Sequence, residues 1–449
     1  MQTNLADFIK DTPEGKEAEA ILRTCVHCGF CLATCPTYQL LGDELDSPRG
    51  RIYLMKQMLE GEPVTEKTQL HLDRCLTCRA CETACPSGVR YGHLVDIGRG
   101  IVEKKVGRSL AAGSMRYVLR QVLPNPSLFA SLLKVGRAVR PLLPSELKDS
   151  VPAAPMEESR PLHAARHERR MLVLQGCVQP ALAPNINAAA ARVLDKLGIS
   201  LISAPDAGCC GAVSYHLNAQ REGLDYMRRN VDAWWPYIAP KPEKEPGVKP
   251  ETKGRATEGA KEETRGVEAI VMTASGCGAT VEEYGHLLRH DPAYAEKAAR
   301  ISELTRDISE IVEAEMPALV SLLSKSTAGR ENPRQKLAFH SPCTLQHGMR
   351  IRGVAEKILA AAGFDLTYVP DAHLCCGSAG TYSILQPELS QQLLKNKVTA
   401  LESGHPDRIA TANIGCLMHI RSGAALPVEH WIEILDETLE AAQPGTIED

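Results

Sequence analysis

Two runs of four cysteines constrain this chain more than any other feature of its 449 residues. Each run has the spacing C-x2-C-x2-C-x3-C-P, and the second lies 50 residues after the first. This spacing is a ligand pattern for [4Fe–4S] clusters in which the fourth cysteine of each run ligates the other cluster. It therefore predicts two clusters with crossed ligands. The first cluster would take Cys25, Cys28, Cys31 and Cys85, and the second would take Cys75, Cys78, Cys81 and Cys35.

Structural zinc and disulfide bonds are the alternatives for these cysteines. Structural zinc favours two separated C-x2-C pairs over a triple with a fourth cysteine three residues on. Residues 1–16 contain no apolar core, so we expect no secretory signal. Sixteen cysteines without such a signal indicate a reducing, cytoplasmic compartment, where cysteines are more often metal ligands than disulfides. The same counts leave a purely structural zinc protein as the least favoured hypothesis.

Charge and hydropathy argue against nucleic-acid binding and against a membrane-spanning helix. The net charge is −4, which gives no signature of nucleic-acid binding. No run of about 18 apolar residues occurs, so no membrane-spanning helix is expected.

The segment between the two cysteine runs has helical periodicity. Residues 49–61 and 65–75 place apolar side chains three and four apart among strong helix formers. A domain of two cysteine runs separated by helices resembles the α-helical ferredoxin domain of succinate dehydrogenase iron–sulfur subunits. The resemblance implies clusters held between helices in a small bundle.

The other eight cysteines form a second repeat. Cys177 precedes the pair Cys209–Cys210 and a glycine, and Cys343 precedes Cys375–Cys376 and a glycine, 166 residues later. Each set closes with a Gly-Cys dipeptide, at Cys277 and at Cys416. The first repeat is longer because it contains residues 240–266, which are rich in Pro, Lys, Glu, Gly and Thr. That composition predicts a disordered or extended insertion.

Both later repeats have an α/β pattern. Strands are expected at 171–177 and 199–205, and again at 336–343 and 364–370, with helices at 187–198 and 353–363 between them. Alternating strands and helices indicate a parallel or mixed sheet. The cysteines follow the predicted strand ends, where α/β folds place their sites.

These repeats resemble the cysteine-rich CCG domain of heterodisulfide reductase subunits and lactate-utilisation proteins. That family has a second cysteine shortly after the closing one, and both repeats here lack it. Three hypotheses stay open: a further iron–sulfur or zinc centre, small buried reduced thiols that shape an interface, and disulfide exchange between the vicinal pairs. The third-centre ligands would be Cys343, Cys375, Cys376, Cys416 and His419 or His340; repeat one would offer Cys177, Cys209, Cys210 and Cys277.

No nucleotide-binding glycine motif and no hydrolase motif follows any predicted strand. Iron–sulfur clusters move single electrons, whereas an organic hydride donor needs a cofactor such as flavin to split the electron pair. The chain is therefore expected to be a relay, with the flavin on another subunit and no catalytic acid, base or nucleophile of its own.

The strings CPTYQLLGDELDSPRGRIYL, HLCCGSAGTY and HWIEI, together with the whole layout, resemble the family of glycolate oxidase iron–sulfur subunits. This resemblance implies FAD-binding partner subunits that oxidise glycolate to glyoxylate, and also D-lactate to pyruvate, with a quinone or other membrane acceptor. The alternatives are a CCG-type disulfide-reducing catalytic subunit and the equivalent subunit of a D-lactate or glycerol-3-phosphate dehydrogenase.

The expected fold is α+β and multidomain. It comprises a helical ferredoxin domain (1–105), a basic amphipathic connector and linker (106–168), CCG repeat one (169–330) and CCG repeat two (331–449). The stretch 104–145 carries eight Lys and Arg residues interleaved with apolar ones and no acid. Such a stretch can lie on an anionic membrane surface, which predicts peripheral contact with the inner face of the cell membrane.

Overall fold

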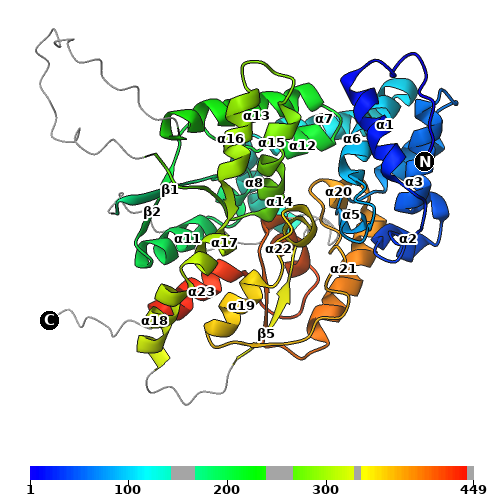
Figure 1. The fold of residues 1–449 in the computed structure, drawn as a ribbon. Helices are drawn as coiled ribbons and strands as arrows, with labels where there is room; N and C mark the ends of the chain where they lie inside the picture. The colour runs from blue at the N-terminus through cyan, green and yellow to red at the C-terminus, as the bar shows by residue number, and fades with distance from the viewer. Residues whose placement is uncertain (143–166, 239–265, 328–334, 442–449) are drawn as a thin grey trace, which may run out of the picture.

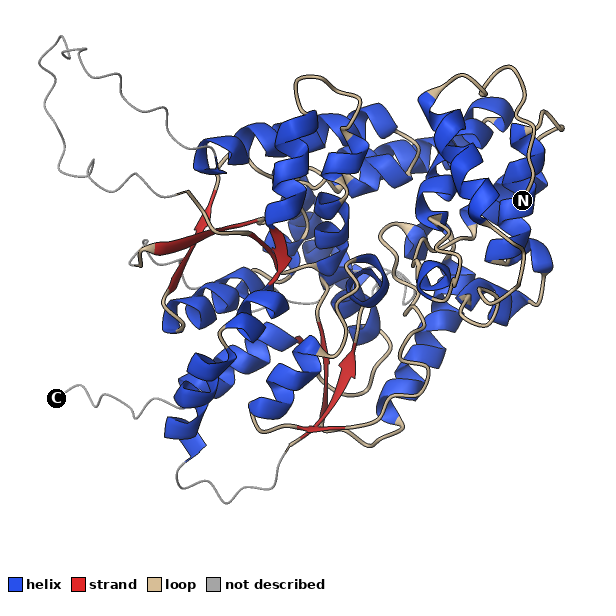
Figure 2. Ribbon diagram, viewed as in Figure 1, coloured by secondary structure: helices blue, strands red, loops and turns tan. Residues whose placement is uncertain are grey.

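The computed structural model describes residues 1–142, 167–238, 266–327 and 335–441 (Figure 1). Within these ranges the chain is mainly helical and contains two separate four-stranded sheets (Figure 2). The insertion predicted at 240–266 lies, except for its last residue, outside the described residues, as do residues 143–166 of the connector and linker predicted at 106–168. None of the described helices is long and apolar enough to cross a membrane.

The N-terminal part is a bundle of short helices. It comprises α1 (Pro13–Thr24), α2 (Pro36–Leu41), the 3-10 turn η1 (Glu44–Asp46), α3 (Pro48–Leu59), α4 (Glu66–Asp73), α5 (Ala80–Thr83) and α6 (Tyr91–Val106). The helices predicted at 49–61 and 65–75 are confirmed as α3 and α4. Leu22, Met55, Leu72 and Leu94 are fully buried between them. Burial of side chains of this size stabilises each by about 1.5–3 kcal/mol.

The start of α3 is determined by the sequence Ser47-Pro48-Arg49-Gly50. The Ser47 hydroxyl accepts a hydrogen bond from the amide of Gly50, and Pro48 occupies the first helical turn, where no amide donor is needed. A Cβ at Gly50 would lie 2.0 Å from the carbonyl oxygen of Glu44. Glycine is therefore required for η1 to pack directly against α3, which brings the residues after Cys35 close to this helix.

Two helices, α7 (Leu110–Val122) and α8 (Pro126–Val139), followed by the 3-10 turn η2 (Arg140–Leu142), form the described part of the predicted connector. Only Leu119 is buried in α7, and α8 buries none of its residues. The two helices lie along the outside of repeat one, where α8 contacts α10 and α7 contacts α12.

The first α/β unit follows. Its elements are β1 (Arg169–Val173), α10 (Gln179–Leu182), α11 (Asn185–Lys196), β2 (Ile199–Ser203), α12 (Ala212–His216), α13 (Gln220–Ile238), β3 (Ile270–Met272), α14 (Ser275–Glu282), α15 (Tyr284–Leu287), α16 (Ala295–Leu304), β4 (Thr305–Asp307), α17 (Ile308–Ala314) and α18 (Met316–Thr327).

The second unit repeats the pattern in fewer residues. Its elements are β5 (Lys336–His340), the π-helical turn η3 (Thr344–Gly348), α19 (Val354–Ala361), β6 (Asp365–Leu366), α20 (Tyr382–Leu385), α21 (Pro387–Glu402), β7 (Arg408–Thr411), α22 (Ile414–Arg421), β8 (Val428–His430) and α23 (Trp431–Glu440).

The two sheets have the same topology. Their strand orders are β2-β1-β3-β4 and β6-β5-β7-β8, and all neighbouring strands are parallel. The predicted α+β class, with a helical domain followed by two α/β repeats, is confirmed. In each sheet the chain reverses its winding direction after the second strand, so a switch point lies between the first and third strands, and α/β proteins bind ligands at the carboxyl edge of such a point.

One hydrophobic core joins the two repeats. Helix α11 of repeat one packs along α23 at the end of the chain, and α17 packs on α19. Ile186, Val193, Ile358 and Leu435 are fully buried in this shared core. The repeats therefore present their cysteine edges as parts of one body.

The helical bundle contacts repeat one through a network of charged side chains. Glu17 of α1 lies 3.1 Å from His93 Nδ1 and 3.0 Å from His286 Nε2, and Arg289 donates to it at 2.6 Å. His93 Nε2 lies 3.0 Å from Glu283 Oε2. Burial lowers the pKa of His93, but its hydrogen bonds to Glu17 and Glu283 outweigh burial and raise that pKa to about 9.

This network predicts that stability falls as the pH rises through 9. The raised pKa of His93 means that its contribution is complete below about 6.5, its value in an unfolded chain, and is lost as the pH passes about 9. The contribution is on the order of 3 kcal/mol. We expect the thermal unfolding midpoint of the wild type to fall between pH 6.5 and 9.5 more than that of His93→Gln.

The exposed His290 offers a matched control, because His290→Gln should retain the pH dependence of the wild type. Equal pH dependence in His93→Gln and the wild type would contradict this role of the network.

Candidate metal centres

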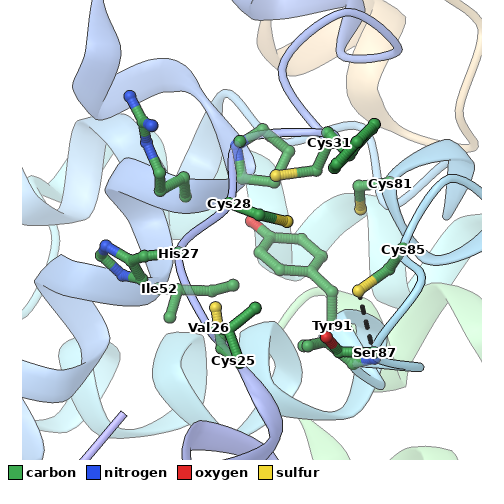
Figure 3. A pocket seen from close by; sticks show the side chains of 15 residues that line it. Cys25, Val26, His27, Cys28, Cys31, Ile52, Cys81, Cys85, Ser87 and Tyr91 are labelled. Atoms are coloured by element: carbon green, nitrogen blue, oxygen red, sulfur yellow. Dashed lines mark hydrogen bonds between the residues drawn. The ribbon is translucent and has the colours of Figure 1, made fainter.

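The eight cysteines of the N-terminal runs line two adjacent pockets in the helical bundle. The first pocket is lined by Cys25, Cys28, Cys31, Cys85 and also Cys81 (Figure 3). The second is lined by Cys35, Cys75, Cys78 and Cys81. Four thiols around one small pocket are the donor set of a [4Fe–4S] cluster, so the residues present fit that group in both places.

The backbone wraps each pocket with the same unusual geometry. His27 and Thr77, which are equivalent in the two runs, have φ of 57° and 52°, and Gly29 and Arg79 have φ of 87° and 60°. Left-handed backbone at a non-glycine residue costs about 1–3 kcal/mol, and such strain clusters at ligand sites. Alternating left-handed residues coil the chain so that the first three sulfurs of each run face one point.

The two pockets differ in exposure. In the first, Cys28 is exposed, and the neighbouring Val26 and Phe30 are 67% and 65% exposed. In the second, Cys35, Cys75 and Cys81 are buried. Tyr91 is 3% exposed, lines both pockets and lies with its hydroxyl oxygen 3.6 Å from Cys75 Sγ.

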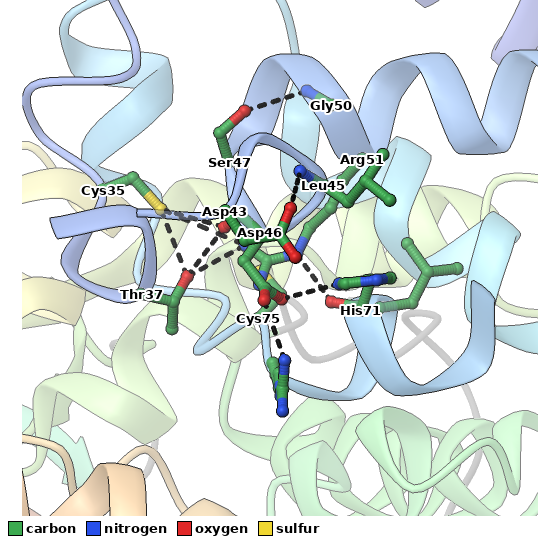
Figure 4. A network of polar contacts seen from close by, with 12 residues as sticks. Cys35, Thr37, Asp43, Leu45, Asp46, Ser47, Gly50, Arg51, His71 and Cys75 are labelled. Carbon is green, nitrogen blue, oxygen red and sulfur yellow. Dashed lines mark hydrogen bonds and ion pairs between the residues drawn. The ribbon is translucent and has the colours of Figure 1, made fainter. Parts of the chain in front are cut away.

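A buried ionic network supports the second pocket (Figure 4). Asp46 is fully buried; its carboxylate lies 3.2 Å from Arg51 Nη2, 2.9 Å from Arg74 Nη1 and 3.1 Å from His71 Nδ1. Burial lowers the pKa of Arg51, but the charges of Cys75, Tyr91, Cys35 and Asp46 outweigh it and hold that pKa above its ordinary value. Arg51 is therefore a buried cation beside a group of thiols.

This network was not predicted from the sequence, although two of its residues stand in a string used above. The Asp-Ser-Pro-Arg-Gly-Arg string that supported the family resemblance contains both Asp46 and Arg51. A buried pairing cannot be recognised from the string alone, because acids and bases at this spacing are usually solvated.

The eight later cysteines gather at the carboxyl edges of the two sheets, as their positions after the strands predicted. In repeat one, the neighbouring thiols of Cys177 and Cys210 raise the pKa of Cys209, and those of Cys209 and Cys277 lower the pKa of Cys210, so the four thiols form one group. In repeat two, Cys343 Sγ lies 3.9 Å from Cys375 Sγ.

Repeat two also brings a histidine to its cysteines. His340, Cys376 and Cys416 are all buried and place their ligand atoms within 4.8 Å of one another. Both ring nitrogens of His340 are buried without a hydrogen-bond partner. His419, which the sequence analysis also considered, instead lies with its Nε2 3.1 Å from Ser390 Oγ.

Close backbone approach explains the glycine after each vicinal cysteine pair. Gly211 and Gly377 have φ of 90° and 94°, and a Cβ at either would lie 2.6 Å from a backbone oxygen, of Gly223 in α13 or of Ser390 in α21. The amides of these glycines lie 3.5 and 3.4 Å from Cys209 Sγ and Cys375 Sγ. The glycine therefore turns the chain so that the pair faces inward.

The cysteine edge of repeat two lies directly against the second pocket. Cys343, Cys375, Leu76 and Tyr382 form one buried cluster against which Cys78 packs. The Tyr382 hydroxyl donates to the Arg74 carbonyl at 3.2 Å, and Thr83 Oγ1 lies 3.0 Å from His347 Nδ1. The second pocket and the thiols of repeat two are thus neighbours in one interface.

Comparisons with known proteins agree with this architecture. Residues 21–89 match the 4Fe-4S dicluster domain family, and residues 171–241 and 337–421 match the cysteine-rich CCG domain family. The chain is 53% identical over 440 residues to the glycolate oxidase iron-sulfur subunit of Escherichia coli (strain K12), covering 98% of this chain and 100% of that protein.

The chain belongs to the glycolate oxidase iron–sulfur subunit family. The probable glycolate oxidase iron-sulfur subunit of Bacillus subtilis (strain 168) is 30% identical over 434 residues, covering 90% of this chain and 89% of that protein. Lactate utilization protein A of Bacillus licheniformis (strain ATCC 14580) is 25% identical over 269 residues, or 58% of this chain and 96% of that protein. The predicted family is confirmed, and the dicluster match with its eight cysteines supports two [4Fe–4S] clusters.

That the fourth cysteine of each run ligates the other run's cluster stays a prediction. Paired substitutions test it. Cys25→Ser and Cys85→Ser should alter the same electron paramagnetic resonance signal of the anaerobically purified chain. Cys75→Ser and Cys35→Ser should alter the other signal, because Cys35 lines the second pocket although it lies in the first run. If Cys35→Ser and Cys25→Ser instead changed the same signal, each run would hold its own cluster.

Proposed function

We propose that this chain is the electron-transfer subunit of a flavin-dependent glycolate oxidase complex. The complex would oxidise glycolate to glyoxylate, and D-lactate to pyruvate, on FAD-binding partner subunits. Electrons would pass through this chain to a quinone or other membrane acceptor. The observation that carries the proposal is the pair of adjacent thiol-lined pockets, one exposed and one buried against repeat two. A bound [4Fe–4S] cluster supplies one-electron transfer at each pocket.

The residues of the chain hold, orient and shield these groups. In our assignment Cys25, Cys28, Cys31 and Cys85 hold the first cluster, and Cys75, Cys78, Cys81 and Cys35 hold the second. Its support is the lining of the two pockets, each of which includes its full predicted set. Tyr91 is buried and lines both pockets.

Exposure favours the first pocket as the side that receives electrons. Cys28, Val26 and Phe30 are exposed at its rim, so a partner subunit could approach this pocket directly. The buried second pocket instead adjoins Cys343 and Cys375. We therefore propose that electrons move from the first pocket to the second and toward repeat two.

We propose a third centre in repeat two, held by Cys343, Cys375, Cys376 and Cys416 with His340. Burial, with a smaller effect of Lys397, holds the pKa of His340 well below its ordinary value, so the ring is neutral and can act as a ligand. The absence of a hydrogen bond to either ring nitrogen supports this choice of histidine over His419. Repeat one offers Cys177, Cys209, Cys210 and Cys277, and among the described residues no histidine joins two of these thiols with all three ligand atoms within 4.8 Å of one another, which favours reduced thiols there.

We also propose peripheral contact with the inner face of the cell membrane, but through exposed apolar residues rather than through the basic residues of the stretch 104–145. The arginines of α7 face the protein body: Arg116 lies 3.3 Å from Asp73, and Arg120 lies 3.7 Å from Glu222. Apolar residues are exposed instead, including Leu110 at 92% and Val135 at 59%. Apolar insertion would therefore dominate the contact, and co-sedimentation with lipid vesicles that persists at high salt checks this basis.

A disulfide-reducing catalytic subunit is the second candidate. The 3.9 Å separation of the Cys343 and Cys375 sulfurs, beside Cys78, is the observation that favours it. The neighbouring Cys375 thiol and burial raise the pKa of Cys343, however, which disfavours the thiolate that exchange chemistry requires.

Replacing one cluster ligand tests the division of labour. In the purified complex, Cys81→Ser should abolish glycolate-dependent acceptor reduction, because Cys81 lines both pockets. Flavin bleaching by glycolate should survive, since that step would occur on a partner subunit. Loss of flavin bleaching in a fully assembled complex would contradict the proposed role.

A second substitution separates the two candidate functions. Cys375→Ala should lower the iron content from about twelve to about eight atoms per chain if repeat two holds a third cluster of four irons. Cys209→Ala in repeat one is the matched control and should leave the iron content unchanged. An unchanged iron content in Cys375→Ala would contradict the iron-cluster form of the third centre, and unchanged glycolate activity would argue against disulfide chemistry at this site.

A further inference from the structure

Arg51 is more deeply buried than the other arginines that line the two pockets. Its side chain is 1% exposed, whereas Arg49 at the first pocket is 34% exposed and paired with Glu44 at 2.7 Å. The other arginine of the second pocket, Arg79, pairs with Glu283 at 2.8 Å across the interface with repeat one.

The guanidinium group of Arg51 is oriented by three fixed contacts. Nε donates to the carbonyl of His71 at 2.7 Å, and Nη2 lies 3.2 Å from Asp46 Oδ1. Nη1 donates to Thr37 Oγ1 at 3.1 Å and lies 4.0 Å from Cys35 Sγ. Thr37 Oγ1 in turn lies 2.9 Å from the carbonyl oxygen of Asp46 and 3.3 Å from Cys35 Sγ (Figure 4). The charge is thus directed at one cysteine of the second pocket, both directly and through a hydroxyl group.

Burial and charge act in opposite directions at this pocket. Burial of an anionic iron–sulfur group disfavours the addition of an electron, because added negative charge is poorly solvated in a low-dielectric interior. A cation held close in the same interior has the opposite effect, and water screens it little. The first pocket has neither feature to the same degree, since Cys28 is exposed and Arg49 is partly solvated.

We propose that Arg51, acting through Thr37 and Cys35, raises the reduction potential of the iron–sulfur group in the second pocket and offsets the effect of burial there. Arg51 is a positioning and charge-compensating residue; it holds no ligand atom. Asp46 and Arg74 keep its guanidinium in place, and together they prevent it from turning toward solvent. This inference rests on the proposed pair of clusters and goes beyond it, because it assigns the potential difference between them to one side chain.

Redox titration followed by electron paramagnetic resonance tests the proposal on the full chain. Arg51→Gln should shift the midpoint potential of one cluster signal downward and leave the other unchanged. The shifted signal should be the one that Cys75→Ser alters. Thr37→Val, which removes only the hydroxyl group, should give a smaller shift of the same signal in the same direction. Arg51→Lys, which retains the charge, should shift it less than Arg51→Gln.

Arg108→Gln is the matched control, because Arg108 is also a largely buried arginine of the helical bundle, bonded to Asp73 and Glu103, and lines neither pocket. It should leave both midpoint potentials at their wild-type values. Arg51→Gln could lose a cluster on purification. The inference is then tested with Arg51→Lys and Thr37→Val, and an unchanged midpoint potential in Thr37→Val would overturn it. Unchanged potentials, or equal shifts of both signals, in a fully loaded Arg51→Gln would also overturn it.

Iron and sulfide analysis separates this failure from failure of the proposed function. Fewer than about eight irons per wild-type chain would refute the two clusters themselves. At least eight irons with no effect of Arg51 would refute only the inference about potential.

Discussion

The helical bundle depends on the carboxylate of Asp46, which is fully buried and lies against Arg51, Arg74 and His71. These contacts join the two cysteine runs: Arg74 directly precedes Cys75, and Arg51 reaches Thr37 and Cys35. A buried charge that loses its partner costs on the order of 3–5 kcal/mol, so the arrangement has little freedom to change. The cysteines that line the second pocket are therefore held close together by an ionic interaction within the protein itself.

The two α/β repeats bring their cysteines together by sharing one sheet topology. In each, the first cysteine follows the central strand, the vicinal pair follows the edge strand beside it, and the closing cysteine begins a helix after the third strand. Parallel strands place all these positions at one edge, so cysteines far apart in sequence meet without any long-range signal. Docking of the bundle against this edge gives the second pocket its neighbours Cys343 and Cys375.

Much of this could be predicted from the residues because the signals were local or repeated. The cysteine spacing indicated the grouping of ligands, and helical periodicity placed α3 and α4. The choice between His340 and His419 could not be predicted in the same way. Both lie near cysteines in the chain, but His419 is on α22 and points to Ser390, whereas His340 ends β5 at the cysteine edge. The sequence also could not predict that the basic side chains of α7 face the protein body, because their acidic partners Asp73 and Glu222 lie in distant segments.

The sequence by itself determined the chemistry: sixteen cysteines in two kinds of repeat, four per group, with glycines and prolines where the backbone must turn. These features are local, because a ligand run or a left-handed glycine acts through its immediate neighbours. Only the tertiary structure decided the environment of each group. It made the first pocket exposed and the second buried, placed Arg51 beside Cys35, and set repeat two against Cys78. Burial and electrostatic compensation depend on every element that packs around a site, and no single stretch of sequence contains them.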